Sequence, residues 1–324
     1  MKKKIIGMGN AVLDILAPVT EEFLNSKNLK KGSMILVNQE VSDKILREID
    51  PIKKDSGGSV ANTIVGTSLL GSDSFFCGKV KNDLLGNEFV KDMRNTNTKF
   101  LCNQSSTGLP TARCIIFVTP DGERSMQTFL GASTTLDEGD IEENFFDEVN
   151  FLLIEGYLWS SNSAKKAIKK AVEIAKRKNV KIIFSLSDFN LVKMFREEFS
   201  DFIKSHVHIL IGNENEFEEL FDNGVEEKFI KQNITELMIK TKGEKGVEVF
   251  QLDKKNSIPS FAVKSVVDTT GAGDMFAAGF LHQMINGKEP LECASFGCKM
   301  ASVIIQQYGA RLSKEMINDL VKKN

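Results

Sequence analysis

The chain has 324 residues, with 42 basic and 44 acidic side chains and a formal net charge of −2 at pH 7. A balance this close to neutral excludes a chain held to nucleic acid or to an anionic membrane by overall charge, so neither partner is predicted. Hydrophobic residues make up 41% and charged residues 27%, which is typical of a globular protein and too apolar for a disordered one.

The numbers of cysteines and histidines further limit the kinds of site that the protein can contain. The five cysteines are scattered and none forms a C-x-x-C pair, which argues against a disulfide framework and against a structural zinc site. Three histidines leave little material for a metal cage or a Ser-His-Asp triad. The longest uncharged helix-like run, residues 275–287, is too short to span a bilayer. We therefore expect a cytoplasmic location.

Short apolar runs alternate with helical patterns along the whole chain. The predicted strands are the apolar runs Lys4–Met8, Ser74–Gly78, Phe151–Ile154, Lys181–Leu186, Ile209–Ile211, Glu236–Thr241, Gly246–Leu252 and Val263–Val267. The predicted helices have apolar residues at helical spacing and are Val60–Leu70, Leu85–Asn95, Ala164–Lys178, Glu214–Phe221, Met275–Asn286 and Leu291–Gln307. This alternation predicts an α/β fold with a doubly wound, mainly parallel sheet, in a single domain over 1–324.

One segment interrupts the alternation of strands and helices. Thr111–Val118 is typical of a strand, Thr-Pro-Asp-Gly at 119–122 of a turn, and Arg124–Leu130 of a returning strand, which together predict a β-hairpin. Residues from about 16 to 37 also lack clear helical periodicity. We expect these pieces, about 15–40 and 100–130, to form a small β-sheet that serves as a lid over a site.

The predicted helix Ala164–Lys178 carries a run of basic side chains away from its apolar stripe. These residues are Lys165, Lys166, Lys169, Lys170, Lys176 and Arg177. They indicate either an anion-binding patch or a solvated helix face. The solvated face is favoured, because charge runs usually only face water.

The most specific motif is Val-Val-Asp-Thr-Thr-Gly-Ala-Gly-Asp at 266–274. A β-branched run leads into a glycine turn and then a helix, whose N–H groups and dipole suit a phosphate. We expect the helix terminus to lower the pKa of Asp274 and to keep it ionised near neutrality. A carboxylate there can take the proton from a substrate hydroxyl. The alternative is an aspartate that only caps the helix.

Two further motifs offer polar groups to a hydroxylated ligand. Ser56–Asn62 contains the pair Gly57 and Gly58 and opens a helix, with Ser59 and Asn62 pointing short polar groups outward. Its alternative, a helix start capped by Ser59, is favoured when the motif is taken alone. Asn10 and Asp14 follow the first predicted strand, where ligands of open α/β sheets lie, and can accept from a vicinal diol. A turn with a solvated aspartate is the alternative.

Two weaker motifs follow later strands. Asn213 and Glu216 in Asn-Glu-Asn-Glu can order a hydrated Mg²⁺, although a capping box explains them better locally. Thr241–Gly246 suits either a nucleotide-binding loop or a glycine hairpin. The sequence has no G-x-x-x-x-G-K-[ST] string and no G-x-G-x-x-G between a strand and a helix. P-loop enzymes are thereby excluded and dinucleotide dehydrogenases are disfavoured.

Together and in this order, the motifs resemble those of the ribokinase-like (PfkB) family of carbohydrate and nucleoside kinases. GMGNAVLD at 7–14 is similar to the family's first substrate-binding segment and SGGSVAN at 56–62 to its glycine-pair signature. NENE at 213–216 resembles its Asn-x-x-Glu motif, TKGEKG at 241–246 its nucleotide loop, and DTTGAGD at 268–274 its catalytic signature. The resemblance covers nearly the whole chain.

The resemblance implies ATP-dependent transfer of a phosphoryl group to a primary hydroxyl of a ribose-like substrate. The implied catalytic groups are Asp274 as base and the backbone N–H groups of Gly271, Ala272 and Gly273. The implied sugar-binding residues are Asn10, Asp14, Gly57, Gly58, Ser59 and Asn62. The implied ATP-binding residues are Thr241, Gly243, Gly246 and Asn213, with Mg²⁺ ordered through water by Asn213 and Glu216. A monovalent cation, usually K⁺, is implied near the anion hole.

Within the family, the chain looks most like adenosine kinases. GMGNAVLDI, GGSVANTI and the hairpin residue Arg124 favour that group, which implies that Tyr157 stacks on the base and that Arg124 closes on the phosphate. Met34 and Thr270 depart from the adenosine kinase pattern, so another nucleoside or a sugar such as ribose or fructose stays open as substrate. A non-catalytic nucleoside-binding homologue and a nicotinamide-dependent oxidoreductase are the alternatives from other classes. The family resemblance is compatible with a monomer or a homodimer.

Overall fold

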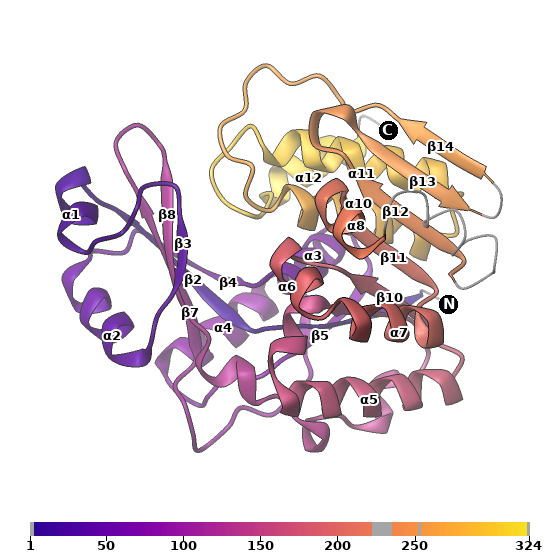
Figure 1. Ribbon diagram of the computed structural model, residues 1–324, viewed down its shortest axis with the longest axis horizontal. Coiled ribbons are helices and arrows are strands. Elements are labelled where there is room, and N and C mark those ends of the chain that lie inside the picture. The colour runs from indigo at the N-terminus through magenta and orange to yellow at the C-terminus, as the bar shows by residue number, and fades with distance from the viewer. Residues whose placement is uncertain (1–2, 222–234, 252–253, 323–324) are drawn as a thin grey trace.

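The structure is a computed structural model that describes residues 3–221, 235–251 and 254–322, and its strands form two sheets (Figure 1). The larger sheet has nine strands in the order β14 (Lys254–Ile258), β13 (Val247–Gln251), β12 (Leu237–Thr241), β11 (Ile209–Asn213), β10 (Lys181–Ser185), β9 (Val149–Glu155), β1 (Lys4–Met8), β5 (Asp73–Cys77) and β6 (Lys99–Phe100). All neighbours pair in parallel except at β12–β13 and β13–β14.

The smaller sheet has five strands and forms the separate lobe at the left of Figure 1. Its order is β3 (Met34–Leu36), β8 (Arg124–Phe129), β7 (Ala112–Val118), β2 (Val12–Pro18) and β4 (Lys53–Gly57). Two helices, α1 (Glu21–Ser26) and α2 (Gln39–Glu48), accompany it. The prediction of an α/β fold with a mostly parallel sheet and a second small sheet is therefore confirmed.

Helices cover both faces of the larger sheet. On one side lie α3 (Ser59–Leu69), α4 (Leu84–Asn95), α10 (Ala272–Ile285) and α11 (Pro290–Ile304), with α12 (Lys314–Lys322) packed outside them. On the other side lie α5 (Asn162–Arg177), α6 (Phe189–Met194), α7 (Arg196–His206) and α8 (Glu214–Leu220). Short 3₁₀ helices occur at Gly131–Thr135, Glu138–Asp140, Glu143–Phe146, Gly156–Ser160 and Gly243–Lys245.

Alternation along each central strand explains this layering. Ile5 of β1 lies in the core under α3 and α10, whereas its neighbour Ile6 lies in the core under α5. Successive side chains of a strand point to opposite faces, so a strand that is apolar at every position requires cover on both sides. Within the described residues, no helix is long and apolar enough to cross a membrane.

The predicted elements match the structure closely in the middle of the chain and fail near residue 260. The segment Val263–Val267 was expected to be a strand, and this prediction is wrong. Val266 is 59% exposed, and the Val267 N–H donates to the Ile305 carbonyl at 2.7 Å instead of joining a strand ladder. Polar β14, which the apolar pattern missed, occupies that sheet edge, and its lysines suit an exposed edge. Residue 252, the predicted end of the preceding strand, lies outside the described residues.

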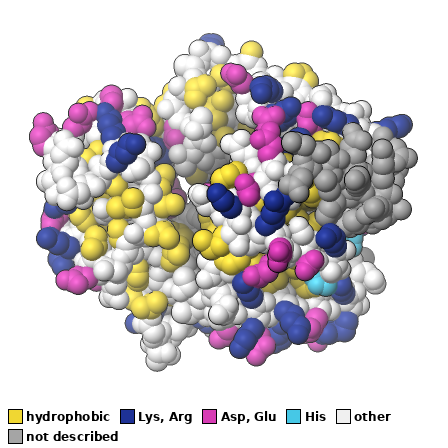
Figure 2. All heavy atoms as spheres, viewed as in Figure 1, with side chains coloured by type: hydrophobic (Ala, Val, Ile, Leu, Met, Phe, Trp, Pro, Cys, Tyr) yellow, Lys and Arg dark blue, Asp and Glu magenta, His cyan; other side chains and the backbone are white. Residues whose placement is uncertain are grey.

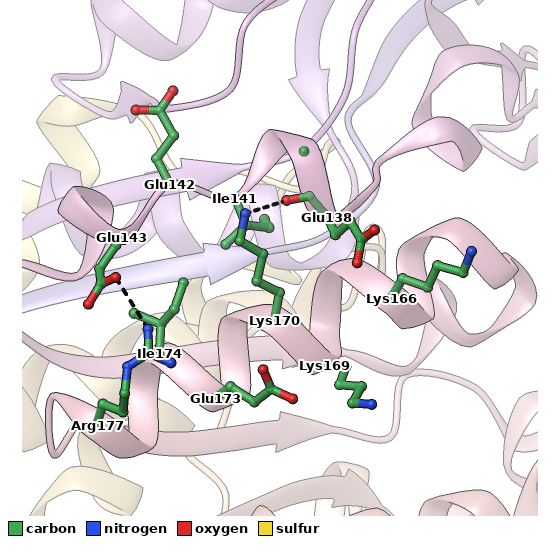
Figure 3. A pocket seen from close by; sticks show the side chains of 11 residues that line it. Glu138, Ile141, Glu142, Glu143, Lys166, Lys169, Lys170, Glu173, Ile174 and Arg177 are labelled. Carbon is green, nitrogen blue, oxygen red and sulfur yellow. Dashed lines mark hydrogen bonds and ion pairs between the residues drawn. The ribbon is translucent and has the colours of Figure 1, made fainter.

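Part of the basic face of α5 pairs with acidic side chains or backbone carbonyls of neighbouring segments. Lys165 pairs with Glu198 at 2.7 Å and Arg177 with Glu143 at 3.3 Å, while Lys170 donates to the Glu138 carbonyl at 2.8 Å. Figure 3 shows the open pocket of about 910 Å³ beside this helix, where acidic and basic side chains alternate. The solvated-face interpretation of the sequence therefore agrees with the structure.

A cluster of aromatic rings holds α7 against the larger sheet. The Phe184 ring of β10 is fully buried and lies 5.1 Å from Trp159 and 5.0 Å from Phe199, measured between ring centroids. Edge-to-face contacts of this kind add to the free energy gained by burying the rings. This cluster makes a large contribution to the stability of the domain.

Replacing Phe184 by alanine should lower the free energy of unfolding by about 3–5 kcal/mol, because the substitution leaves a cavity that its neighbours cannot fill. Urea denaturation followed by tryptophan fluorescence measures the change, since Trp159 lies in the same cluster. The half-exposed Phe189, replaced in the same way, is the control and should cost less than about 1 kcal/mol. Equal losses in both variants would contradict this account of the core.

Candidate active site

The carboxyl ends of the parallel strands and the small sheet border one hollow in the molecular surface. Figure 2 shows this hollow between the small-sheet lobe at the left and the rest of the molecule, with hydrophobic side chains gathered beside it. Substrates of open α/β sheets bind outside these strand ends. The glycine-rich motifs that the sequence singled out all lie here, at the starts of α3 and α10 and after β1.

Asp274 lies in the first turn of α10 and receives hydrogen bonds from α3. The Ser59 hydroxyl donates to its Oδ1 at 2.7 Å and the Asn62 amide nitrogen to its Oδ2 at 3.0 Å. Helix α10 begins after Gly271, whose φ of 75° is left-handed and whose Cβ, if present, would lie 2.6 Å from the Ala310 backbone. Only glycine fits that turn. The N–H of Ala272, at the helix start, donates to the Thr269 carbonyl at 3.1 Å.

The pKa of Asp274 differs from the sequence expectation. Burial raises it from 3.8 to about 6, against the lowering effect of the bonds from Ser59 and Asn62 and the charge of Arg311. The expectation that the helix terminus lowers this pKa is therefore wrong, because desolvation outweighs it. A carboxylate with a pKa near 6 remains mostly ionised at pH 7 and accepts a proton more readily than an ordinary aspartate.

The start of α3 differs from the alternative in which Ser59 caps the helix. Gly58 is the N-cap, and no side chain caps the helix there. Its φ of 102° and the Asn10 carbonyl, which would lie 2.3 Å from an added Cβ, require glycine. Ser59 therefore does not cap the helix, and its hydroxyl donates to Asp274 instead.

Glu155 joins two of the predicted substrate segments, and sequence reasoning missed it. Its carboxylate is fully buried at the end of β9 and accepts from the backbone N–H groups of Asn10 at 2.7 Å and Val60 at 3.0 Å. Burial raises its pKa to about 7. The available signal was an acidic residue directly after an otherwise apolar strand. Glu155 fixes the spacing between the segment after β1 and the start of α3.

Asp14 reaches the same hollow from the small sheet. It lies on β2 opposite Asp55 of β4, and burial raises its pKa to about 7, a shift that Arg311 opposes and that Asp55 and Asp274 reinforce. The electrostatic interaction of Asp14 with Asp274 brings together a carboxylate of the small sheet and one of α10. Gly57, also predicted, lies next to Asp14 across the β2–β4 pair.

Arg124 connects the hairpin of the small sheet to the turn before Asp274. Its Nη1 forms an ion pair with Asp268 at 2.9 Å, and both side chains are buried. Asp268 also accepts from the backbone N–H groups of Thr270 and Gly309, each at 2.9 Å. Within the described residues, Nε and Nη2 of Arg124 have no hydrogen-bond partner. Two nitrogens of the buried Arg124 guanidinium therefore remain available for hydrogen bonds beside the glycine turn.

Two adjoining cavities lie on either side of this turn. The smaller, about 150 Å³, is lined by predicted residues that include Ser59, Asn213, Glu216, Gly273 and Asp274. The larger, about 540 Å³, shares Thr241 and Gly273 with it and continues along mostly apolar side chains. Its lining includes Gly243, Gly246, Val263, Val266, Ala272, Phe276 and Ile305. A phosphate chain fits the first cavity and a flat, apolar base fits the second.

Asn213 and Glu216 form the capping box that the local sequence favoured. Asn213 accepts from the Glu216 N–H at 3.0 Å, while its own N–H and side-chain amide donate to Glu216 at 2.8 Å each. Burial raises the Glu216 pKa to about 7. Within the described residues, no three His, Cys, Asp or Glu side chains meet in a direct metal site. A carboxylate and an amide at the cavity wall fit a magnesium ion that keeps its water shell.

Tyr157 stands apart from these two cavities. It lies in the 3₁₀ helix after β9, its hydroxyl donates to the Ser187 carbonyl at 3.2 Å, and burial raises its pKa. It is not among the residues that line either cavity. Met34, on edge strand β3, is 53% exposed.

Comparison with known proteins agrees with this geometry. The profile of the pfkB family of carbohydrate kinases matches residues 25–316. The crystal structure of adenosine kinase from Sinorhizobium meliloti is 33% identical, with a TM-score of 0.88 and 100% of both chains covered. Adenosine kinase 2 of Arabidopsis thaliana is 28% identical, with 94% of each chain covered. The 5-dehydro-2-deoxygluconokinase of Halalkalibacterium halodurans is 26% identical, with 86% of this chain and 89% of the relative covered.

The family match spans far more than half of the chain, and the similar proteins include both nucleoside and sugar kinases. The dehydrogenase alternative is thereby overturned. The chain belongs to the pfkB family of carbohydrate kinases and is a phosphotransferase with an alcohol group as acceptor.

Proposed function

We propose that this kinase transfers the γ-phosphoryl group of ATP to the primary hydroxyl of a ribose-containing substrate, with the 5′-hydroxyl of adenosine as the preferred acceptor. The observation that carries this proposal is the half-buried Asp274 carboxylate, oriented by Ser59 and Asn62 at the wall of a cavity of about 150 Å³. The similarity to an adenosine kinase over the whole chain supports the choice of acceptor.

In the proposed reaction, Asp274 takes the proton from the acceptor hydroxyl. That oxygen forms a bond to the γ-phosphorus, the bond between the γ-phosphorus and the bridging oxygen breaks, and ADP leaves. The backbone N–H groups of Gly271, Ala272 and Gly273 at the start of α10 stabilise the charge on the transferred group. The Arg124 guanidinium, with two unused donors beside the same turn, is suited to bind phosphate oxygens.

ATP is assigned to the two adjoining cavities. Its base would lie against the apolar lining near Phe276 and Val263, with Thr241, Gly243 and Gly246 at the other wall. When bound, Mg²⁺ neutralises phosphate charge, and Asn213 and Glu216 would hold it through water. Glu216 is held by its capping bonds in an orientation that keeps its carboxylate at the cavity wall.

The acceptor is assigned to the hollow between Asp274 and the small sheet. Asp14 and Asn10 are proposed to bind sugar hydroxyls, with Gly57, Gly58, Ser59 and Asn62 at the start of α3 beside them. The small sheet is proposed to close as a lid and to exclude water during transfer. One of its faces is apolar around Val12, Cys114 and Ile116, which supports a substrate that carries a flat base as well as a sugar.

A sugar without a base is the second candidate acceptor. It is supported by the similarity to 5-dehydro-2-deoxygluconokinase and by Tyr157, whose hydroxyl is tied to Ser187 rather than placed in the cavities described above. The cytoplasmic location and the oligomeric state stay predictions from the sequence.

Replacing Asp274 by asparagine should lower kcat by about 10²–10⁴ while changing the KM of the acceptor little, because the general base is lost while the side-chain shape and one of the two hydrogen bonds from α3 are kept. In the unmodified enzyme, kcat/KM should fall as the pH drops through about 6, where Asp274 becomes protonated. Asp73→Asn, on an exposed residue at the opposite end of the sheet, is the control. Near-normal turnover by the Asp274 variant would remove this residue from the role of base.

Replacing Asp14 by alanine should raise the KM of the acceptor strongly and leave the KM of ATP nearly unchanged, because the carboxylate is proposed to contact only the sugar. Steady-state kinetics with each substrate varied in turn measures this. The exposed Asp50 of the same lobe, replaced by alanine, serves as control. Equal increases for both substrates would argue against a sugar contact.

The acceptor itself is tested by ADP release from Mg-ATP in the presence of K⁺. The panel contains adenosine, guanosine, cytidine, ribose, fructose, fructose phosphates and 5-dehydro-2-deoxygluconate. We expect selective turnover of adenosine. Turnover of a sugar alone would keep the mechanism at Asp274 and replace the proposed acceptor.

A further inference from the structure

Arg311 lies in the segment between α11 and α12, outside every motif discussed above, yet its side chain reaches Asn62. Its Nε donates to Asn62 Oδ1 at 2.9 Å, and its Nη1 donates to Ser56 Oγ at 2.8 Å and to Asp92 Oδ2 at 2.9 Å. The guanidinium side chain is 10% exposed. Within the described residues, Nη2 has no hydrogen-bond partner.

We propose that Arg311 is a positioning residue for phosphoryl transfer, which acts through the Asn62 amide on the carboxylate of Asp274. The proposal rests on the function proposed above, because it takes Asp274 as the base. It extends the working machinery to a segment about 40 residues further along the chain.

The hydrogen bonds from Arg311 to Asn62 and from Asn62 to Asp274 form a relay, and the chemistry of the donors and acceptors fixes its direction. A guanidinium can only donate hydrogen bonds, and an ionised carboxylate can only accept them. Asn62 lies between one of each, so its oxygen must face Arg311 and its nitrogen must face Asp274. Without Arg311, the amide oxygen loses its donor, and only the bond to Asp274 still orients the amide. A flipped amide would direct an oxygen at the carboxylate and repel it.

The guanidinium is itself held in place from two further elements. Asp92 of α4 accepts from Arg311 and also from the Ser56 hydroxyl at 2.6 Å and the Ser56 N–H at 2.9 Å. Ser56 belongs to β4 of the small sheet. Arg311 therefore lies where α3, α4 and the small sheet meet, and its planar fork has fixed partners on two edges.

Charge gives Arg311 a second effect on the same site. It lowers the pKa of Asp274 and that of Asp14, both of which burial raises. The other charged groups that act here are Asp55 beside Asp14, Glu155 behind the start of α3, Asp92 on the far side of Arg311, and Arg124 from the hairpin. In this mainly acidic surrounding, Arg311 is the cation linked through one side chain to Asp274.

A purely structural brace is the competing explanation, since Arg311 also attaches the segment before α12 to the rest of the domain. A brace would affect stability and overall activity. It would leave the titration of Asp274 and the energetic coupling to Asn62 unchanged.

The first test is a titration in the absence of substrate. The protein is labelled with ¹³Cγ-aspartate, and the Asp274 signal is assigned by its loss in Asp274→Asn. We expect Arg311→Met to raise the Asp274 pKa by about one unit, since a nearby positive charge is removed. Arg311→Lys keeps the charge and should shift it much less. Arg113→Met removes a more deeply buried arginine of the small sheet that pairs with Asp43 of α2, and should leave the Asp274 signal in place.

The second test is kinetic and uses the same variants. Arg311→Met should lower kcat/KM by about 10²-fold and move its acid limb to higher pH. Arg311→Lys should keep the pH profile but still lower kcat about 10-fold, because an ammonium group lacks the fork that orients Asn62. In an Asn62→Ala background, Arg311→Met should cause little further loss of kcat, because the relay is already broken.

The outcomes separate the two proposals. An unshifted Asp274 titration in Arg311→Met, together with additive losses in the double variant, would reduce Arg311 to a brace and overturn the inference. If Arg311→Met does not fold, the kcat of Arg311→Lys with and without Asn62→Ala decides the relay: a loss that disappears in the Asn62→Ala background supports it, and an additive loss overturns it. Failure of every acceptor in the panel would instead overturn the proposed function, and the substrate-free titration would still decide the role of Arg311.

Discussion

The hydrogen bonds from α3 to the half-buried carboxylate of Asp274 are the contacts on which the rest of the site depends. Two helices from opposite ends of the sequence begin at the same point, and Ser59 and Asn62 of one hold the acidic side chain of the other. Burying a carboxylate costs free energy unless donors surround it. The starts of α3 and α10 must therefore keep fixed positions relative to each other, and so must every element that holds them there.

Several of those elements act through a second buried carboxylate. Glu155 accepts from the backbone of both segments and so ties the end of β1 to the start of α3. Its raised pKa, like that of Asp274, reflects burial among few charges of opposite sign. A cluster of carboxylates with raised pKa values is the expected environment for a group that must accept a proton near neutrality. Burial of the carboxylates thus accounts both for the hydrogen bonds that surround them and for their raised pKa values.

The small sheet is connected to this centre by charge rather than by a shared strand. Arg124 pairs with Asp268 beside the glycine turn, and Arg311 reaches Ser56 at the end of β4. Each of these arginines keeps at least one buried nitrogen without a hydrogen-bond partner among the described residues. The contact between the two lobes is thus polar where substrate is proposed to bind and apolar on the lid face around Cys114 and Ile116.

The sequence by itself determined the layers of the fold and most of the proposed site. Uniformly apolar strands such as Phe151–Ile154 require helices on both faces, and glycine turns such as 271–273 are local features that neighbouring residues specify. Only the tertiary structure decided the pKa of Asp274, the roles of Glu155 and Arg311, and the irregular path of Val263–Val267. The hydrogen bonds that decide the roles of Glu155 and Arg311 join residues 95 and 249 positions apart, and local patterns carry no record of such contacts.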